Sequence, residues 1–108
     1  LQLESMPVAC VLFDADFIVT YFNPAAERIF GYRRADVVNR DSFETFLLPE
    51  RRHIIEPIFA RLRAGEYVSA FGETRRADGR TVIVEWVNTP LLEPGGRFIG
   101  AMSMAQDV

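Results

Sequence analysis

The chain has 108 residues, of which 49% are hydrophobic, and it carries a net charge of −3. This length predicts one domain with its own core, and no apolar run reaches the roughly 18 residues of a membrane-spanning helix. All twelve basic residues are Arg, and they are scattered along the chain, whereas a nucleic-acid-binding domain concentrates them in a basic patch. The single Cys10 permits neither an internal disulfide nor a Cys-based metal cluster.

The N-terminal segment, LQLESMP, has no initiator Met, no basic region and no signal-like apolar block. We therefore expect residues 1–108 to be a single domain excised from a longer multidomain protein. Because nothing in the sequence requires an oxidising compartment and no apolar run could span a membrane, we expect a cytoplasmic location and no membrane contact by this domain.

The chain is predicted to begin with a β-hairpin. The run 8–13 (VACVLF) is apolar and has the length of a strand. Turn-type residues follow at 14–16, and the run 17–22 (FIVTYF) is rich in the β-branched and aromatic residues that favour strands.

Short helices are predicted to follow the hairpin. Asn23 is suited to cap a helix that has Pro24 in its first position, and Gly31 is suited to end that helix. The segments 33–38 and 42–47 are predicted to form further single turns.

One long helix is predicted over residues 49–64, and Gly65 ends it. Pro57 lies inside this segment and should bend or loosen its first half. Apolar residues recur in it at positions i, i+3, i+4 and i+7, which is typical of one buried helical face. These residues are Ile55, Ile58, Phe59 and Leu62.

The pattern changes to a period of two after Gly65, which predicts three more strands. The strands are expected at 67–76, 81–91 and 98–106, with turns at 77–79 and 93–96. Because strands and helices are segregated along the chain, the sequence predicts an α+β domain with a five-stranded antiparallel sheet and its helices on one face.

Several stretches, in their order and spacing, resemble the sequence pattern of PAS domains, the sensor modules of many bacterial signalling proteins. The resemblance covers essentially the whole chain. It implies that the helices starting at Pro24 and Pro49 form the wall of a pocket over the sheet. The stretches that carry it are Tyr21–Glu27, Phe30–Tyr32, Leu48–Arg51, Ala77–Arg80, and Gly100 with Asp107–Val108.

The resemblance also implies a salt bridge from Glu27 to a basic residue just before the Asp-Gly turn. Here that position is Ala77, and Arg76 comes one residue earlier. A shift of one residue along a strand turns the side chain to the other face, which argues against this bridge.

PAS domains bind haem, flavins, small acids or no visible ligand. His53 is the only histidine, but it falls about 160° around the helix from Ile55, and the haem ligand of similar sensors falls near Ile54. Photoactive flavin domains use a Cys that falls here at Ser42, and Cys10 is expected to be a core residue. Haem and covalent flavin are therefore not expected, non-covalent flavin stays open, and the cofactor is unknown.

The strand faces predict which residues line the pocket. Residues 82, 84, 86 and 88 share one side of the fourth strand, and flavin-binding relatives imply that this side faces inward. On the last strand, the matching side is assigned to residues 100, 102, 104 and 106. The predicted ligand-binding residues are Trp86, Asn88, Val84, Met102, Met104, Ile55, Ile58 and Phe59. Alternatively, these side chains fill the cavity themselves.

No catalytic triad, metal-ligand spacing or phosphate loop is present, so the domain is not expected to be an enzyme. One hypothesis is a sensor that regulates a C-terminal effector, either a histidine kinase of a two-component system or a cyclic-di-GMP synthase or hydrolase. The alternative is a ligand-free dimerisation and spacer module. In both cases we expect a homodimer that uses the outer sheet face, including Val87 and Leu91, and the N-terminal segment 1–5.

Overall fold

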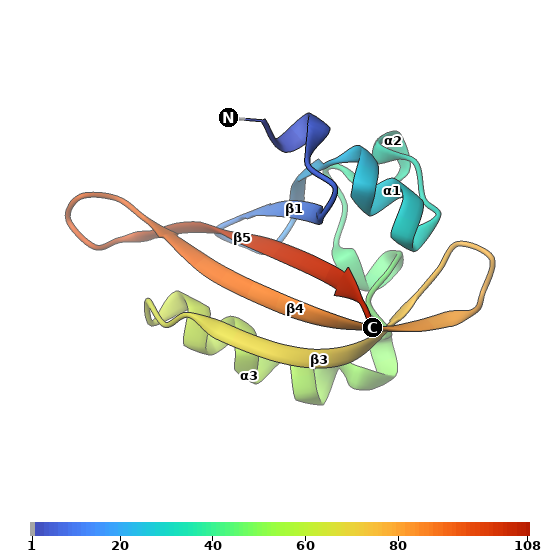
Figure 1. Cartoon of the computed structure of the whole chain (residues 1–108). Coiled ribbons are helices and arrows are strands. Elements are labelled where there is room, and N and C mark those ends of the chain that lie inside the picture. Colours follow the sequence, from blue (N-terminus) through green and yellow to red (C-terminus); the bar gives the residue numbers. More distant parts are fainter. Residues whose placement is uncertain (1) are drawn as a thin grey trace.

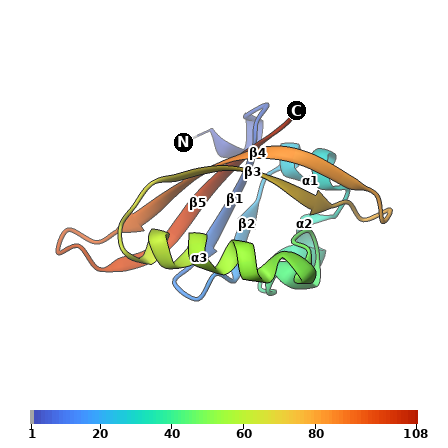
Figure 2. The same cartoon turned by 90° about the horizontal axis from the view of Figure 1, so that it is seen from below.

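The structure, a computed structural model, describes residues 2–108 and contains a five-stranded antiparallel sheet in the order β2-β1-β5-β4-β3 (Figures 1 and 2). The predicted α+β architecture is confirmed. The strands are β1 (Ala9–Asp14), β2 (Val19–Phe22), β3 (Val68–Arg75), β4 (Thr81–Leu92) and β5 (Phe98–Asp107). The helices are α1 (Pro24–Phe30), α2 (Arg34–Val37) and α3 (Arg52–Arg63), with 3-10 turns η1 (Leu3–Ser5), η2 (Ser42–Glu44) and η3 (Pro49–Arg51).

The predicted ends of α1 are confirmed. The Asn23 side chain accepts a hydrogen bond from the Ala26 backbone N–H at 2.9 Å, and Pro24 occupies the first helical position. Gly31 ends the helix with φ of 77°, a left-handed conformation that glycine adopts without a Cβ clash.

The predicted long helix is also present, although its first turn is the 3-10 turn η3. Pro57 lies inside α3, and Gly65 follows the helix with φ of 86°. Leu62 is buried, the other three residues of the predicted apolar stripe are half-buried, and His53 is exposed. Figure 2 shows α3 running across the inner face of the sheet.

Aromatic rings from three parts of the chain form the centre of the core. Phe22 of β2, Phe30 of α1 and Phe46 of the segment before η3 are fully buried. Their ring centroids lie 5.2–6.1 Å apart, within the range of favourable aromatic pairs. This cluster fixes α1 and the 42–48 segment against the sheet.

A bulge interrupts the pairing of β4 with β5. Leu92 pairs with Phe98, but Leu91 pairs with Gly100, so Ile99 has no partner of its own on β4. A side chain at Gly100, whose φ is 158°, would overlap the carbonyl oxygen of Phe13 on β1. The bulge in β5 therefore lies next to a position where only glycine lets the backbones of β5 and β1 approach so closely.

Because of the bulge, the side chains of β5 lie on the opposite faces from those predicted. Continuing the Leu92–Phe98 pairing without it would put Met102 opposite Asn88, whereas the structure has Ser103 there. A shift of one residue exchanges the two faces of a strand. The prediction that Met102 and Met104 face inward was therefore wrong, since both lie on the outer face opposite Thr89 and Val87.

The outer face of the sheet is lined by apolar side chains from four of the five strands. Phe71 and Ile83 are 66% and 52% exposed, and the others are half-buried. The residues that share this face in the observed register are Leu12, Phe71, Ile83, Val87, Leu91, Met102 and Met104.

The N-terminal turn η1 lies on the opposite side of the sheet from α3 (Figure 1). Glu4 contacts the Tyr21 hydroxyl and pairs with Arg34 at 2.9 Å, while the Leu3 carbonyl accepts a hydrogen bond from Asn23. Leu1, part of the segment expected to join the dimer contact, lies outside the described residues. None of the helices formed by residues 2–108 has the length and apolar character of a membrane span.

Arg76 contacts the end of α1 and not the Glu27 side chain. Its guanidinium donates to the carbonyls of Arg28 and Ile29, and Ala77 N–H donates to the Phe30 carbonyl at 2.8 Å. The Glu27 carboxylate instead accepts from the Arg34 backbone N–H at 2.7 Å. Within residues 2–108 the Glu27 salt bridge is absent, and the guanidinium satisfies the carbonyls that a helix C-terminus leaves free.

Candidate functional site

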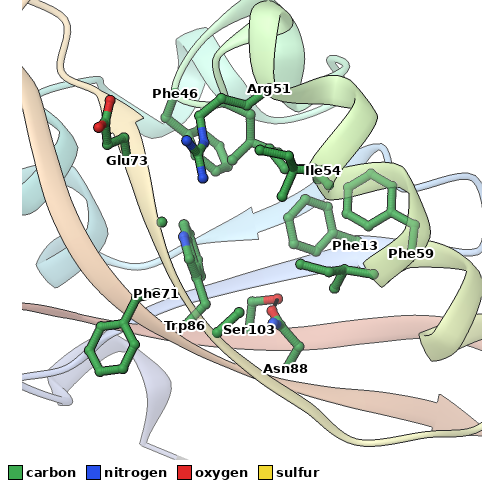
Figure 3. A pocket seen from close by; sticks show the side chains of 15 residues that line it. Phe13, Phe46, Arg51, Ile54, Phe59, Phe71, Glu73, Trp86, Asn88 and Ser103 are labelled. Carbon is green, nitrogen blue, oxygen red and sulfur yellow. Dashed lines mark hydrogen bonds between the residues drawn. The ribbon is translucent and has the colours of Figure 1, made fainter.

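A pocket with a volume of about 60 Å³ lies between α3 and the β3–β4 side of the sheet (Figure 3). Its lining is mostly apolar, with a few polar groups, which is the usual character of a small-molecule site. The lining residues are Phe13, Phe46, Leu47, Arg51, Ile54, Ile55, Ile58, Phe59, Ala70, Phe71, Gly72, Glu73, Trp86, Asn88 and Ser103.

Small residues on the inner face of the sheet create this space. Ala70 and Gly72 of β3 carry almost no side chain toward α3, and Ser103 is the small residue of β5 that lines the pocket. A Cβ at Gly72 would lie 3.8 Å from the Trp86 indole. Because large side chains at these positions would close the gap, the pocket results from the small side chains on β3 and β5.

Trp86 forms one wall of the pocket and continues the aromatic core. Its ring stacks on Phe30 with a centroid distance of 5.7 Å and an interplanar angle of 9°, and it lies 6.1 Å from Phe46. On the side of α3, Phe59 stacks on Phe17 at 4.0 Å. These contacts fix the ring planes, so the wall has a defined shape before any ligand enters.

Asn88 and Ser103 form a hydrogen-bonded pair at the base of the pocket. The Ser103 hydroxyl donates to Asn88 Oδ1 at 2.6 Å, and Asn88 Nδ2 donates to the Val68 carbonyl at 3.1 Å. Asn88 is only 7% exposed. A buried Asn side chain needs hydrogen-bond partners, and here the protein itself provides them.

Five of the eight predicted pocket residues line the cavity, namely Ile55, Ile58, Phe59, Trp86 and Asn88. Val84 is fully buried on the inner face of β4 but lies outside the pocket lining. Met102 and Met104 lie on the other face of the sheet, because the bulge shifts the register of β5. That these residues bind a ligand stays a prediction.

Sequence reasoning missed several residues of the lining. Phe46, Leu47 and Arg51 come from the irregular segment before α3, where no periodicity assigns a face. Gly72 did carry a signal, because a glycine inside a strand often marks close approach by another group.

The pocket does not fit haem or flavin in this conformation. Its 60 Å³ is small beside the roughly 300–1,000 Å³ of pockets that take drug-sized ligands. His53 is exposed, and Ile54 lines the pocket without a metal-ligating atom. Ser42 is buried but has no thiol, and Cys10 faces away, opposite Met104, where burial raises the pKa of its thiol.

A second hollow of about 160 Å³ lies on the other side of α3, and its lining is charged. Arg52 pairs with Glu56 at 3.1 Å and lies over the Phe43 ring, and Arg63 lies over the Phe17 ring. These cations already have partners within the protein, so the apolar pocket is the better candidate site. Among residues 2–108, no group of three His, Cys, Asp or Glu side chains could hold a metal ion.

Comparisons with known proteins identify the family of this fold. The PAS fold family matches residues 1–108. A solved RNA-binding Light-Oxygen-Voltage receptor is 25% identical with a TM-score of 0.89, and the match covers 98% of this chain and 31% of that one. This chain therefore spans about a third of that receptor.

Two further solved structures share the fold. The PAS domain of a Colwellia psychrerythraea protein is 16% identical with a TM-score of 0.89, covering 98% of this chain and 90% of that one. The VqmA dimer of Vibrio cholerae is 19% identical with a TM-score of 0.79, covering 97% of this chain and 48% of that one. No curated protein matches the sequence.

Proposed function

Because the chain belongs to the PAS family, whose domains are sensory and not catalytic, we propose that it binds a small-molecule cue in the pocket beneath α3 and relays binding to an effector. The observation that carries this proposal is the pocket itself, which small residues leave open between an aromatic wall and α3. The few polar groups in its lining can orient a ligand, as is typical of small-molecule sites.

The size of the cavity suggests how binding produces a signal. A volume of about 60 Å³ is well below the roughly 300–1,000 Å³ of pockets that hold drug-sized ligands. A larger cue must therefore shift α3, which packs on β3 and β4. Strand β5 pairs with β4 and ends at Asp107, so it can pass the shift to an effector on the C-terminal side of Val108. Such coupling typically amounts to about 1–3 kcal/mol.

The effector proposed for this domain is a histidine kinase or a cyclic-di-GMP synthase or hydrolase in a bacterial cytoplasmic protein. One relative is described as RNA-binding. The present chain has a net charge of −3 and scattered Arg residues, which supports regulation of an effector over nucleic-acid contact by this domain.

Native mass spectrometry of freshly purified protein, with a near-ultraviolet and visible absorbance scan, tests the proposal. We expect a small, non-chromophoric mass adduct that is lost on unfolding. Ala70→Leu should abolish the adduct, because residue 70 lines the pocket, whereas Ser69→Leu on the outer face should keep it. A haem or flavin band would contradict the proposed kind of cue, and a bare protein mass would favour the alternative function.

The alternative function is a ligand-free dimerisation and spacer module. The apolar outer face favours it, since contiguous exposed apolar patches mark interaction sites. Homodimerisation through this face and the N-terminal segment is compatible with both functions. A fold relative is described as a dimer.

Val87→Glu is expected to shift the protein from dimer to monomer in sedimentation velocity runs while its circular dichroism stays native. Val87 is half-buried at the centre of the outer face, opposite Met104, and a carboxylate there would lose its hydration in a dimer. Ile54→Glu, the same kind of change on α3, should leave the dimer intact. A wild-type protein that stays monomeric at high concentration would contradict the proposed interface.

A further inference from the structure

Among the described residues that line the pocket, Arg51 alone carries a positive charge. It ends the turn η3 at the entry to α3, and Figure 3 shows its guanidinium reaching over the cavity toward Trp86. Arg51 is half-buried, and apolar side chains such as Ile54 and Phe46 lie beside it in the lining. A guanidinium in such surroundings has lost part of its hydration, which strengthens its attraction for an anion.

The neighbouring charges are engaged elsewhere. Glu50 lies 3.6 Å from Arg75, and Arg52 pairs with Glu56 at 3.1 Å. Within residues 2–108, Arg51 has no ion pair and no side-chain hydrogen bond. The one carboxylate in the lining, that of Glu73, belongs to the outer face of β3, opposite Ile83, and points away from the cavity in Figure 3.

The base of the pocket has the opposite character. Ser103 already donates to Asn88, and Asn88 in turn donates to the Val68 carbonyl, so both side chains have partners within the protein. A ligand therefore needs no polar group at this end. A cationic mouth and an apolar interior of about 60 Å³ together define an amphipathic ligand with one anionic end and a body of a few carbon atoms.

We propose that the pocket binds a short monocarboxylate with a compact apolar body, and that Arg51 holds its carboxylate. Arg is suited to this role because its planar fork donates two parallel hydrogen bonds to the two carboxylate oxygens. The body lies among Ile54, Ile58 and Trp86. This inference rests on the proposed sensory function and specifies the class of cue.

The test uses 3-methylbutanoate and its neutral amide, 3-methylbutanamide, which have nearly the same shape. Each probe is titrated into the wild-type chain, Arg51→Gln and Arg52→Gln, and binding is followed by amide chemical shifts of β3 and α3. We expect the wild type to bind the carboxylate at least fivefold more tightly than the amide. Arg51→Gln should remove this preference, and Arg52→Gln, at an exposed and paired neighbour, should keep it.

The outcomes separate this inference from the proposed function. Equal binding of acid and amide, unchanged in Arg51→Gln, would overturn the role of Arg51 while supporting a ligand-binding pocket. Failure of both probes to shift pocket resonances would overturn the proposal of a short carboxylate. The native mass spectrometry described above would then test the sensory function independently. Native circular dichroism of Arg51→Gln shows that its lost preference is not a folding defect.

Discussion

Trp86→Ala is expected to lower the free energy of unfolding by about 3 kcal/mol, at the lower end of the range for truncating a large buried aromatic residue. The loss arises because the indole stacks on Phe30 at 5.7 Å and lies 6.1 Å from Phe46, so its removal opens the wall between the pocket and the aromatic core. The lower end applies because Trp86 is half-buried and not fully enclosed. Chemical denaturation followed by circular dichroism measures the change.

Trp86→Phe serves as the matched control. A phenyl ring at this position keeps the stack on Phe30 and fills most of the volume, so it should recover more than half of the loss. If Trp86→Ala cost less than 1 kcal/mol, the ring would contribute little to packing, and its position on the inner face of β4 would be contradicted.

The ends of the helices could be predicted because their signals are local. Asn23, Pro24 and Gly31 act within a few residues of one another, and each occupies the predicted role in α1. The stripe on α3 is equally local, since it depends only on the helical period. Such features require no knowledge of which segments meet in space.

The faces of β5 could not be assigned in this way, because they depend on the register of a long hairpin. The single bulge at Ile99 turns the Ala101–Ser103–Ala105 series inward and the Met102–Met104 pair outward. The glycine at position 100 was the available signal, because an isolated glycine in a strand suggests a bulge.

The pocket was only partly predictable, for a related reason. The apolar side that α3 contributes to the pocket follows from periodicity, but the pocket volume depends on the lack of large side chains at Ala70 and Gly72. Arg51 belongs to a short turn whose direction is set by tertiary packing. Sequence patterns find large apolar residues more readily than the gaps between them.

Asn23→Ala is expected to destabilise the domain by about 3–5 kcal/mol, because one fully buried side chain joins three parts of the chain. Its Oδ1 accepts from Cys10 N–H at 2.8 Å and from Ala26 N–H at 2.9 Å. Its Nδ2 donates to the carbonyls of Leu3 and Val8 at 2.9 and 3.0 Å. The loss of a helix cap accounts for only about 0.5–2 kcal/mol, and the remainder comes from buried backbone groups left without partners.

Asn23→Ser separates the two contributions, because a serine hydroxyl can cap α1 but is too short to reach Leu3 and Val8 as well. It should recover only the cap, about 1 kcal/mol, when both variants are compared by chemical denaturation. Hydrogen exchange should show faster opening of residues 3–10 in both variants, since both lose the bonds that hold the N-terminal segment on β1. Equal stability of Asn23→Ser and wild type would mean that Asn23 acts as a helix cap alone. The N-terminal segment would then be held mainly by Glu4 through Tyr21 and Arg34.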